Sequence, residues 1–362
     1  MEVTPLNIVL LSNWFENPYK DLLIQHLNTK KVYAQEYFRS VFFVQKVLSQ
    51  GKPDILHLQT LHYFFVSRNK IYCWIKFILF ILQLLFMKMI GVKVVWTVHE
   101  WIDKISDGQH NISPLQAAII GKVMTAIITH CDSTKEEMIT ELKLKNCEKV
   151  FVVFHGNYIK AYENNISQLE ARKILNIPEN DCVFLMFGGI HKGKGTLDGV
   201  EAFKKLKQDN IFLIIAGKVS KAEFISSISQ AIGDSKNIIF TTPHEGIPDE
   251  KIQVYMNACD CVILPYTIFT TSGVAILAMS YSKVCMAPRL GFFKDILDDH
   301  GAFLYDPKME DGLLNAMNLS VEKQKILETM GQHNFKVVQE WSWDYVAAKT
   351  YEVYQWCLHH SI

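Results

Sequence analysis

The sequence lacks several features that would place it in a familiar class at once. Its 37 basic and 37 acidic side chains give no formal net charge, whereas a general nucleic-acid-binding protein carries a basic surplus. We therefore expect no nucleic-acid partner. The eight cysteines contain no CxxC pair, which disfavours both a zinc site and a disulfide framework. The thiols are expected to be buried, in a protein of the reducing cytoplasm.

The beginning of the chain has neither the basic start nor the long apolar core of a secretory signal. Its first apolar stretch, residues 6–11, is too short for such a core and predicts a strand instead. A membrane-spanning helix needs roughly 20 mainly apolar residues. Lys76, Gln83 and Lys88 interrupt the most apolar segment, residues 74–90, so we expect no crossing.

Segment 74–90 fits two placements. It is either a buried core helix or a helix that lies on a bilayer, with Lys76 and Lys88 reaching the headgroups. Arg68 and Lys70 precede the segment and would add attraction to anionic lipid. The second placement predicts a peripheral contact at the inner face of the cell membrane.

The composition is globular, with 49% hydrophobic and 20% charged residues, and a length of 362 residues suggests two domains. Apolar runs alternate with helical stretches, which predicts parallel sheets covered on both faces. Expected strands lie at 6–11, 55–58, 93–98, 126–129 and 150–154, and then at 183–187, 211–216, 238–241, 261–264 and 284–287. Two such series predict two Rossmann-like, doubly wound α/β domains, residues 1–160 and 161–342. The aromatic tail from residue 343 to 362 predicts a final amphipathic helix.

A glycine-rich turn follows the strand expected at 183–187. Gly188 and Gly189 let backbone N–H groups approach an anion closely, and the helix after the turn adds the positive end of its dipole. Lys194 supplies a mobile charge for a phosphate. The turn therefore predicts a diphosphate cradle. It matches neither the P-loop pattern nor GxGxxG, which disfavours a kinase and a dehydrogenase.

Further candidates for binding the same ligand follow the neighbouring strands, because ligands of open α/β sheets gather at the carboxyl ends of the strands. Backbone N–H groups at the start of the helix after residue 270 would hold a phosphate or a sugar hydroxyl. These candidates are Lys218, His244, Tyr266, Thr271, Ser272, Gly273 and Val274.

The order and spacing of the two turns resemble the C-terminal domain of glycosyltransferase family 4, which has the GT-B fold. In that family a glycine-arginine and lysine-glycine segment binds the donor diphosphate, and a later A-D-x-x-x-x-P strand leads into the loop that holds the donor sugar. Asp260 and Pro265 match the later pattern, with Cys259 in the alanine position. The resemblance implies two domains that face each other across a cleft, and a C-terminal helix that returns to the first domain.

Two departures from the family pattern leave the donor sugar undefined. Gly189 stands where the family has arginine, so Lys194 is the matched cation, and His191 or Lys192 is expected to supply the missing charge or donor. Phe269 and Leu277 stand where the family has paired glutamates.

The N-terminal half carries the remaining resemblance. His99 resembles the family's histidine beside the donor sugar, where it would hydrogen-bond to that sugar, and Glu100 is a candidate base for an inverting reaction. Asp103 and Asp107 are alternatives to Glu100. Acceptor-binding residues are expected after the first strand and where the chain enters the linker, namely Asn17, Tyr19, His155 and Asn157.

Together these features predict a hexosyltransferase-type enzyme that moves a sugar from a UDP- or GDP-linked donor to an acceptor hydroxyl. The expected acceptor is a lipid-linked or polysaccharide-precursor glycan, because the apolar segment 74–90 suggests a membrane surface. The family resemblance implies retention of configuration. The scheme needs no cofactor and no metal, because Lys194 would offset the charge on the leaving diphosphate.

Three other functions compete with this prediction. A sugar-nucleotide epimerase of the same fold would use the same cradle with acid and base carboxylates, and the missing family glutamates count against it. A non-catalytic homologue would keep the fold without the reaction. A phosphorylase would generally have a much longer chain with a cofactor lysine.

Overall fold

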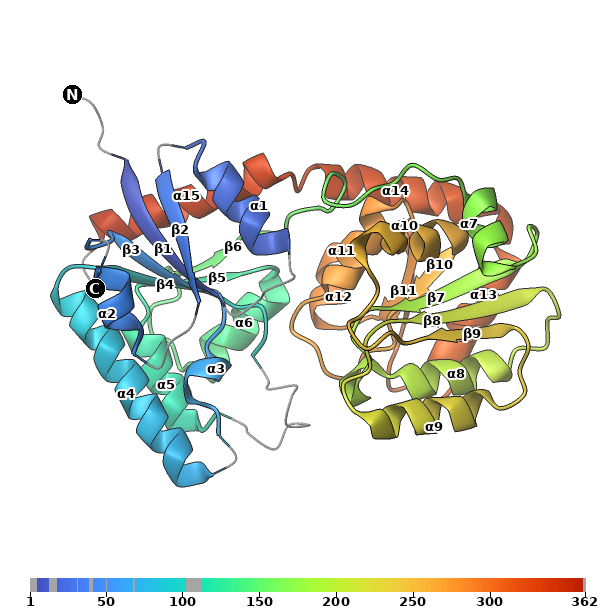
Figure 1. Cartoon of the computed structure of the whole chain (residues 1–362), viewed down its shortest axis with the longest axis horizontal. Coiled ribbons are helices and arrows are strands. Elements are labelled where there is room, and N and C mark those ends of the chain that lie inside the picture. The colour runs from blue at the N-terminus through green and yellow to red at the C-terminus, as the bar shows by residue number, and fades with distance from the viewer. Residues whose placement is uncertain are drawn as a thin grey trace. The chain divides into compact units, whose positions relative to one another are not determined.

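The computed structural model describes residues 5–12, 18–30, 32–38, 42–49, 51–67, 69–101 and 112–360. The chain divides into two compact units, Met1–Gly156 with Trp341–Ile362, and Asn157–Glu340. The sequence places the corresponding boundary at residues 160/161 and the start of the returning tail at residue 343. Each unit is a parallel sheet with helices on both faces (Figure 1).

The first unit has six parallel strands in the order β2-β1-β3-β4-β5-β6. The strands are β1 (Leu6–Ser12), β2 (Val32–Phe38), β3 (Ile55–Leu58), β4 (Lys93–Thr97), β5 (Ala126–Thr129) and β6 (Val150–Val152). Helices α2 (Phe43–Leu48), α3 (His62–Phe65), α4 (Lys70–Met89), α5 (Pro114–Val123) and α6 (Asp132–Glu141) contribute to the core on one face. Helices α1 (Pro18–Leu27) and α15 (Trp343–His359) build the core on the other.

Helix α15 is held to the first unit by polar contacts as well as by apolar packing. Nδ1 of His26, in α1, lies 2.9 Å from Oδ1 of Asp344, in the first turn of α15. Nδ1 of His57, in β3, lies 2.6 Å from the hydroxyl of Tyr354. The aromatic tail therefore covers a face of the first sheet that would otherwise be exposed.

The second unit has six parallel strands in the order β12-β11-β10-β7-β8-β9. The strands are β7 (Cys182–Phe187), β8 (Ile211–Ala216), β9 (Ile238–Thr241), β10 (Cys261–Ile263), β11 (Val284–Pro288) and β12 (Ala302–Tyr305). The helices are α7 (Gln168–Leu175), α8 (Thr196–Lys204), α9 (Ala222–Ile232), α10 (Asp249–Ala258), α11 (Gly273–Ser280), α12 (Gly291–Ile296), α13 (Gly312–Glu322) and α14 (Leu327–Gln339), with 3₁₀ turns η1 (Lys192–Lys194) and η2 (Gln324–Ile326).

The chain order within this sheet defines a switch point. The chain runs outward from β7 through β8 to β9 and then returns to the other side of β7 with β10. The two connections after β7 and β10 therefore diverge to opposite faces. In open α/β sheets a ligand-binding crevice forms at such a point, at the carboxyl ends of the strands.

All ten strands expected from the sequence are present, and the expectation of two doubly wound α/β domains is confirmed. The sequence reading missed β2 and β12. Each lies at the edge of its sheet and pairs with one neighbour. Edge strands need no apolar side chains on both faces, and β2 carries Gln35 and Glu36, so it does not stand out as an apolar run. Strand β12 is a short apolar run of four residues that was overlooked.

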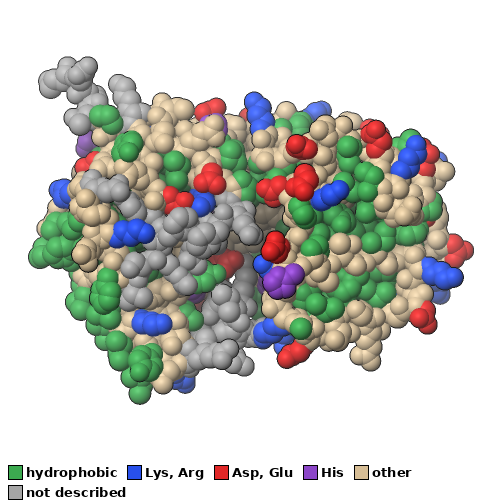
Figure 2. Space-filling model, viewed as in Figure 1, with side chains coloured by type: hydrophobic (Ala, Val, Ile, Leu, Met, Phe, Trp, Pro, Cys, Tyr) green, Lys and Arg blue, Asp and Glu red, His purple; other side chains and the backbone are tan. Residues whose placement is uncertain are grey.

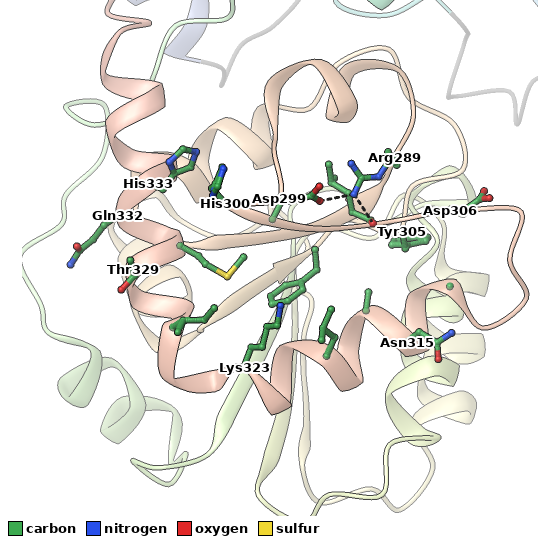
Figure 3. Close-up of a pocket in the computed structure, with 18 of the residues that line it drawn as sticks. Arg289, Asp299, His300, Tyr305, Asp306, Asn315, Lys323, Thr329, Gln332 and His333 are labelled. Atoms are coloured by element: carbon green, nitrogen blue, oxygen red, sulfur yellow. Dashed lines mark hydrogen bonds and ion pairs between the residues drawn. The ribbon is translucent and has the colours of Figure 1, made fainter.

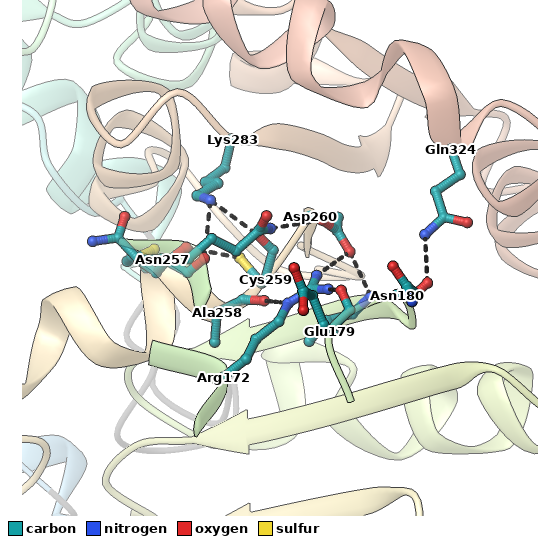
Figure 4. Close-up of polar contacts among 12 residues, drawn as sticks. Arg172, Glu179, Asn180, Asn257, Ala258, Cys259, Asp260, Lys283 and Gln324 are labelled. Atoms are coloured by element: carbon teal, nitrogen blue, oxygen red, sulfur yellow. Dashed lines mark hydrogen bonds and ion pairs between the residues drawn. The ribbon is translucent and has the colours of Figure 1, made fainter. Parts of the chain in front are cut away.

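Asp260 has a structural position at the start of β10, whereas Pro265 follows the end of that strand. The carboxylate of Asp260 accepts from Nη2 of Arg172 at 2.8 Å, from the backbone N–H of Val183 at 2.8 Å and from Nε2 of Gln168 at 2.9 Å (Figure 4). Nε of Arg172, whose residue is 3% exposed, donates to the carbonyl oxygen of Ala258 at 3.0 Å. This ion pair ties α7 to the amino ends of β7 and β10, opposite the carboxyl edge.

Helix α4 is apolar on two faces. Phe77, Phe80, Ile81, Leu84 and Met87 are buried in the core of the first unit. A second stripe faces outward, and its side chains are 46% to 76% exposed: Ile71, Ile75, Ile78, Leu82, Leu85 and Met89. Figure 2 shows hydrophobic side chains gathered at the lower left of the molecule, where α4 runs in Figure 1.

The expected burial in the core is confirmed for one face of segment 74–90, whereas contact of the exposed face with a bilayer stays a prediction. The helix is long and apolar enough to cross a membrane by length and composition, and 22% of its most apolar window is buried. One expectation about its lysines was wrong. Nζ of Lys88 donates to the carbonyl oxygen of Val123 at the end of α5, at 2.9 Å, so it is occupied within the protein.

Candidate functional site

The two sequence motifs of the second unit lie at the switch point and are joined there by backbone hydrogen bonds. The loop after β7 carries Gly193, whose carbonyl oxygen accepts from the N–H groups of Thr267 at 3.0 Å and Ile268 at 3.2 Å. Those two residues belong to the loop after β10. A Cβ atom at Gly195, where φ is +62°, would lie 1.9 Å from the carbonyl oxygen of Pro265, so the two loops are in backbone contact.

The loop after β8 packs against the glycine-rich loop as closely. Ile190 and Lys218 form a backbone hydrogen bond of 2.8 Å. A Cβ atom at Gly217 would lie 1.7 Å from the carbonyl oxygen of Gly188. Lys218 is thereby brought beside the cradle. The loop of His244 approaches it in turn, since a Cβ at Gly246 would lie 3.8 Å from Cβ of Lys218.

The ammonium group of Lys194 packs against an aromatic ring. Its Nζ lies 3.5 Å from the centre of the Tyr266 ring, a distance at which an ammonium group is attracted by the electron-rich face of an aromatic ring. Tyr266 is 5% exposed, and burial raises the pKa of its hydroxyl above the ordinary value. The two motif residues from the loops after β7 and β10 are thus in direct contact.

Helix α11 begins beside the glycine-rich loop. Ser272 is its N-cap residue and accepts from the backbone N–H of Ala275 at 3.2 Å. A Cβ at Gly188 would lie 3.1 Å from Cγ2 of Val274, so the first turn of the helix borders the loop. The N–H groups of Gly273 and Val274, and the positive end of the helix dipole, are therefore located next to the cradle.

The positions matched to the family glutamates are filled by apolar packing. The ring of Phe269 lies 4.6 Å from that of Phe293, which is 5.5 Å from that of Tyr266. Leu277 is 5% exposed. The remaining motif residues differ in exposure. Gly189 and Lys192 are exposed, whereas His191 and Thr271 are half-buried.

In the first unit, four polar side chains follow four successive strands at the carboxyl edge of the sheet. Gln59 follows β3, His99 follows β4, His130 follows β5 and His155 follows β6. Each is buried. Sequence reasoning identified His99 and His155 but missed Gln59 and His130, although both directly follow strands that it expected.

Hydrogen bonds connect three of these side chains. His99 contacts Gln59 through Nε2 at 2.9 Å and His130 through Nδ1 at 3.2 Å. Nδ1 of His130 lies 2.8 Å from the carbonyl oxygen of Val153. Nδ1 of His155 lies 2.7 Å from the carbonyl oxygen of Gly156. Both ring nitrogens of His99 are thus engaged inside the first unit.

Burial keeps His57, His130 and His155 neutral near pH 7. It lowers the pKa of His130 to about 4, and that of His57 and of His155 to about 3, from an ordinary value of 6.5. A neutral imidazole has one donor and one acceptor nitrogen.

The residues expected to bind the acceptor have varied positions. Tyr19 lies in α1, not in a loop as expected, and its ring is buried 4.6 Å from the His99 ring. Nδ2 of Asn157 donates to the carbonyl oxygen of Val338 in the second unit at 3.0 Å. Glu100 is half-buried next to His99. Asn17, Asp103 and Asp107 lie outside the described residues, and the roles assigned to all these residues stay predictions.

One cavity of the second unit lies away from these motifs. It has a volume of about 1140 Å³, borders β12, α13 and α14, and contains none of the predicted site residues (Figure 3). Lys323, Asn315 and Tyr305 are among the side chains that line it. A smaller cavity of about 400 Å³ is lined by Tyr266 and Thr267. We place the site by the joined loops, because they combine glycine turns, a cation and a helix N-terminus at the switch point.

Within the described parts of the chain, no group of three or more histidine, cysteine, aspartate or glutamate side chains is arranged to hold a metal ion. The expectation that the reaction needs neither metal nor cofactor stays a prediction.

Comparison with known proteins gives a family match for the second unit. The model of the family "Glycosyl transferases group 1" matches residues 167–337, which include every motif of the second unit. This domain is similar to the group 1 glycosyl transferases. The prediction of a glycosyltransferase is confirmed at the level of this domain, whereas the narrower assignment to family 4 stays a prediction.

A curated relative of this chain is the lipopolysaccharide 1,2-N-acetylglucosaminetransferase of Salmonella typhimurium. The two sequences are 27% identical over 211 residues. The match covers 55% of this chain and 55% of the relative, so it spans about half the length of each protein.

Solved structures share the fold of the whole chain. A glycosyltransferase of Rickettsia africae has a TM-score of 0.74 at 14% identity, with 99% of this chain and 100% of that chain covered. The HepE protein of Anabaena, solved with UDP and glucose, has a TM-score of 0.72 at 16% identity, with 96% and 98% covered. Sucrose-phosphate synthase of Thermosynechococcus elongatus has a TM-score of 0.77 at 15% identity, with 98% and 100% covered. The GT-B fold is therefore confirmed.

Replacing Gly217 by alanine is expected to destabilise the second unit by more than about 2 kcal/mol, because the new methyl group meets the backbone of Gly188 and cannot be relieved by a rotamer change. Gly189→Ala is the matched control, since a Cβ there meets nothing within 4 Å. Urea unfolding of both variants measures the difference. Equal stability of the two would show that the loops are not packed as described.

The first unit is expected to lose stability in mild acid. Above pH ~6.5 the three buried histidines are neutral in both folded and unfolded chains. Between pH ~6.5 and 4 only the unfolded chain takes up protons at them, so the free energy of unfolding falls by up to about 4 kcal/mol per pH unit. Urea midpoints from pH 7.5 to 5 test this, with His57→Phe as a variant that should have a shallower dependence. A flat profile would contradict the assignment of neutral histidines.

Proposed function

We propose that the chain transfers a glycosyl group from a nucleotide-diphosphate sugar to an acceptor hydroxyl. The observation that carries the proposal is the joining of the glycine-rich loop, Lys194 and the start of α11 at the switch point of the second sheet. Backbone N–H groups and a helix N-terminus suit a diphosphate. The relation to proteins that use nucleotide sugars adds support, since HepE was solved with UDP and glucose.

In this proposal the donor diphosphate lies against Gly188, Gly189 and the first turn of α11. The bond between the anomeric carbon and the diphosphate oxygen breaks, and the acceptor oxygen forms the new bond to that carbon. Lys194 offsets the negative charge that develops on the leaving diphosphate. For the retaining course, the acceptor attacks from the same face, and its proton passes to the leaving phosphate oxygen.

The donor is proposed to be a UDP- or GDP-linked sugar. Lys218, half-buried His191 and exposed Lys192 border the same loops and are proposed to add charge or hydrogen bonds. His99 is proposed to hydrogen-bond to the donor sugar from the first unit. This contact requires one of its present partners to give way.

The acceptor is proposed to be a lipid-linked or polysaccharide-precursor glycan, used by a cytoplasmic protein at the inner face of the cell membrane. The outward stripe of α4 supports this part, because its six apolar side chains follow a 4-3-4-3-4 spacing along one side of the helix. The helix contains three lysines and no acidic residue. A second copy of the chain would bring like charges together there, whereas an anionic bilayer attracts Lys70 and Lys76.

Lys194→Met is expected to weaken the binding of UDP or GDP by about tenfold or more, because hydrogen bonds to charged groups contribute about 1.5–3 kcal/mol. Turnover of the matching nucleotide sugar is expected to fall further, since the leaving diphosphate is more negative than the bound donor. Calorimetry and a transfer assay measure the two effects. The control is Lys236→Met, which removes an exposed lysine of the same unit.

Wild-type binding and turnover in Lys194→Met would remove the lysine from the reaction. No heat from the unchanged protein with UDP, GDP or any sugar nucleotide would overturn the proposed function and favour a non-catalytic protein.

Ile78→Glu with Leu82→Glu is expected to abolish sedimentation of the protein with vesicles that contain anionic lipid, because charges on the outward stripe oppose insertion. Both positions are about half exposed, at 51% and 56%, so folding is expected to be unchanged. Ile174→Glu with Leu290→Glu is the matched control, with exposures of 56% and 54% in the second unit. Phe80 and Leu84 are unsuitable for this test because they are buried at 2% and 0% exposure.

If the α4 variant sediments as the unchanged protein does, the stripe is not the membrane contact. A lower mass of that variant in solution, relative to the unchanged protein, would instead identify a second copy as its occupant.

A further inference from the structure

The polar side chains at the carboxyl edge of the first sheet form a hydrogen-bond network. The donor and acceptor of its first bond, between His130 and the carbonyl of Val153, can be assigned in only one way. A carbonyl oxygen only accepts, so the carbonyl of Val153, 2.8 Å from Nδ1 of His130, requires a proton on that nitrogen. His130 is fully buried, and burial lowers its pKa to about 4. Its ring is therefore neutral near pH 7, and Nε2 carries a lone pair.

The assignment for His130 also determines which ring nitrogen of His99 is the donor. Nε2 of His130 lies 3.2 Å from Nδ1 of His99. Because Nε2 of His130 is an acceptor, Nδ1 of His99 has to be the donor. In the neutral form of His99 the lone pair is then on Nε2, the nitrogen that lies 2.9 Å from the Gln59 amide oxygen.

Gln59 is the member of the network whose side-chain amide can be turned. Its amide has its oxygen toward His99, and its Nε2 has no hydrogen-bond partner among the described residues. A half-turn of the amide presents an N–H group to the lone pair of His99. Gln59 is 1% exposed, so an unpaired amide nitrogen is costly there. The orientation of this amide is therefore the least defined part of the hydrogen-bond network.

We propose that His130 is a positioning residue for His99. By accepting the Nδ1 proton it holds His99 as the Nδ1–H tautomer, so that Nε2 of His99 is a hydrogen-bond acceptor. That nitrogen accepts from Gln59 in the free protein once the amide has made its half-turn, and from a hydroxyl of the donor sugar during transfer. The last step rests on the proposed function, whereas the tautomer of His99 does not.

The tautomer is measured on the full chain labelled with ¹⁵N-histidine, from long-range ¹H–¹⁵N correlations at pH 7.5. Signals are assigned by their loss in His99→Gln and His130→Gln. We expect Nδ1–H for both residues. In His130→Phe, His99 loses its acceptor, and the share of its Nδ1–H form is expected to fall.

Turnover is measured on the same variants. His130→Phe is expected to lower kcat about tenfold, the equivalent of one hydrogen bond of about 1.4 kcal/mol, with the affinity for UDP or GDP unchanged, because the nucleotide binds the second unit. His130→Gln keeps an acceptor oxygen and is expected to restore both the tautomer and most of kcat. His57→Phe removes another buried histidine of the first sheet, which contacts Thr97 and Tyr354, and is expected to leave the His99 signals unchanged.

Three results would overturn the proposal: an Nε2–H tautomer of His99 in the unchanged protein, an unaltered His99 pattern in His130→Phe, or a kcat that stays at the wild-type value when that pattern changes. His130→Gln and the unchanged protein supply the spectra if His130→Phe does not fold. A protein that binds no nucleotide sugar would refute the proposed function, while the spectra would still decide the tautomer.

Discussion

The backbone contact between the loops at the carboxyl edge of the second sheet is the constraint on which the proposed donor site depends. Gly188 and Gly217 are so close that a methyl group does not fit between them, and Gly193 accepts two hydrogen bonds from the loop after β10. The three loops are therefore fixed to one another by main-chain atoms. Their N–H groups keep their places whichever side chains stand nearby, which is compatible with Gly189 and Phe269 at positions where family 4 has charged residues.

Desolvation organises the first unit in a different way. Buried histidines stay neutral, and a neutral imidazole both donates and accepts. A chain of them consequently has a direction, which the carbonyl of Val153 imposes at one end. The same burial that keeps His130 neutral, and so supports the proposed tautomer of His99, is expected to make the unit sensitive to acid.

Helix α4 shows that a single apolar segment can serve two purposes. Its inner face completes the core, where Phe80 and Leu84 are buried, and its outer stripe remains exposed. Half-buried Lys88 is occupied within the protein, because it donates to the last turn of α5. The charge left for an external surface is then that of Lys70 and Lys76, which are on the amino-terminal half of the helix.

The sequence by itself determined the ten apolar strands, the two-sheet architecture and the two turns of the cradle. These are local signals, because a strand buried on both faces has to be apolar and a close backbone approach requires glycine. Only the tertiary structure decided which face of α4 is buried, that Asp260 is an ion-pair partner of Arg172, and that Gln59 and His130 adjoin His99. Those relations join residues dozens of positions apart in the chain. Strand order and helix packing create them, and no periodicity along the sequence records either.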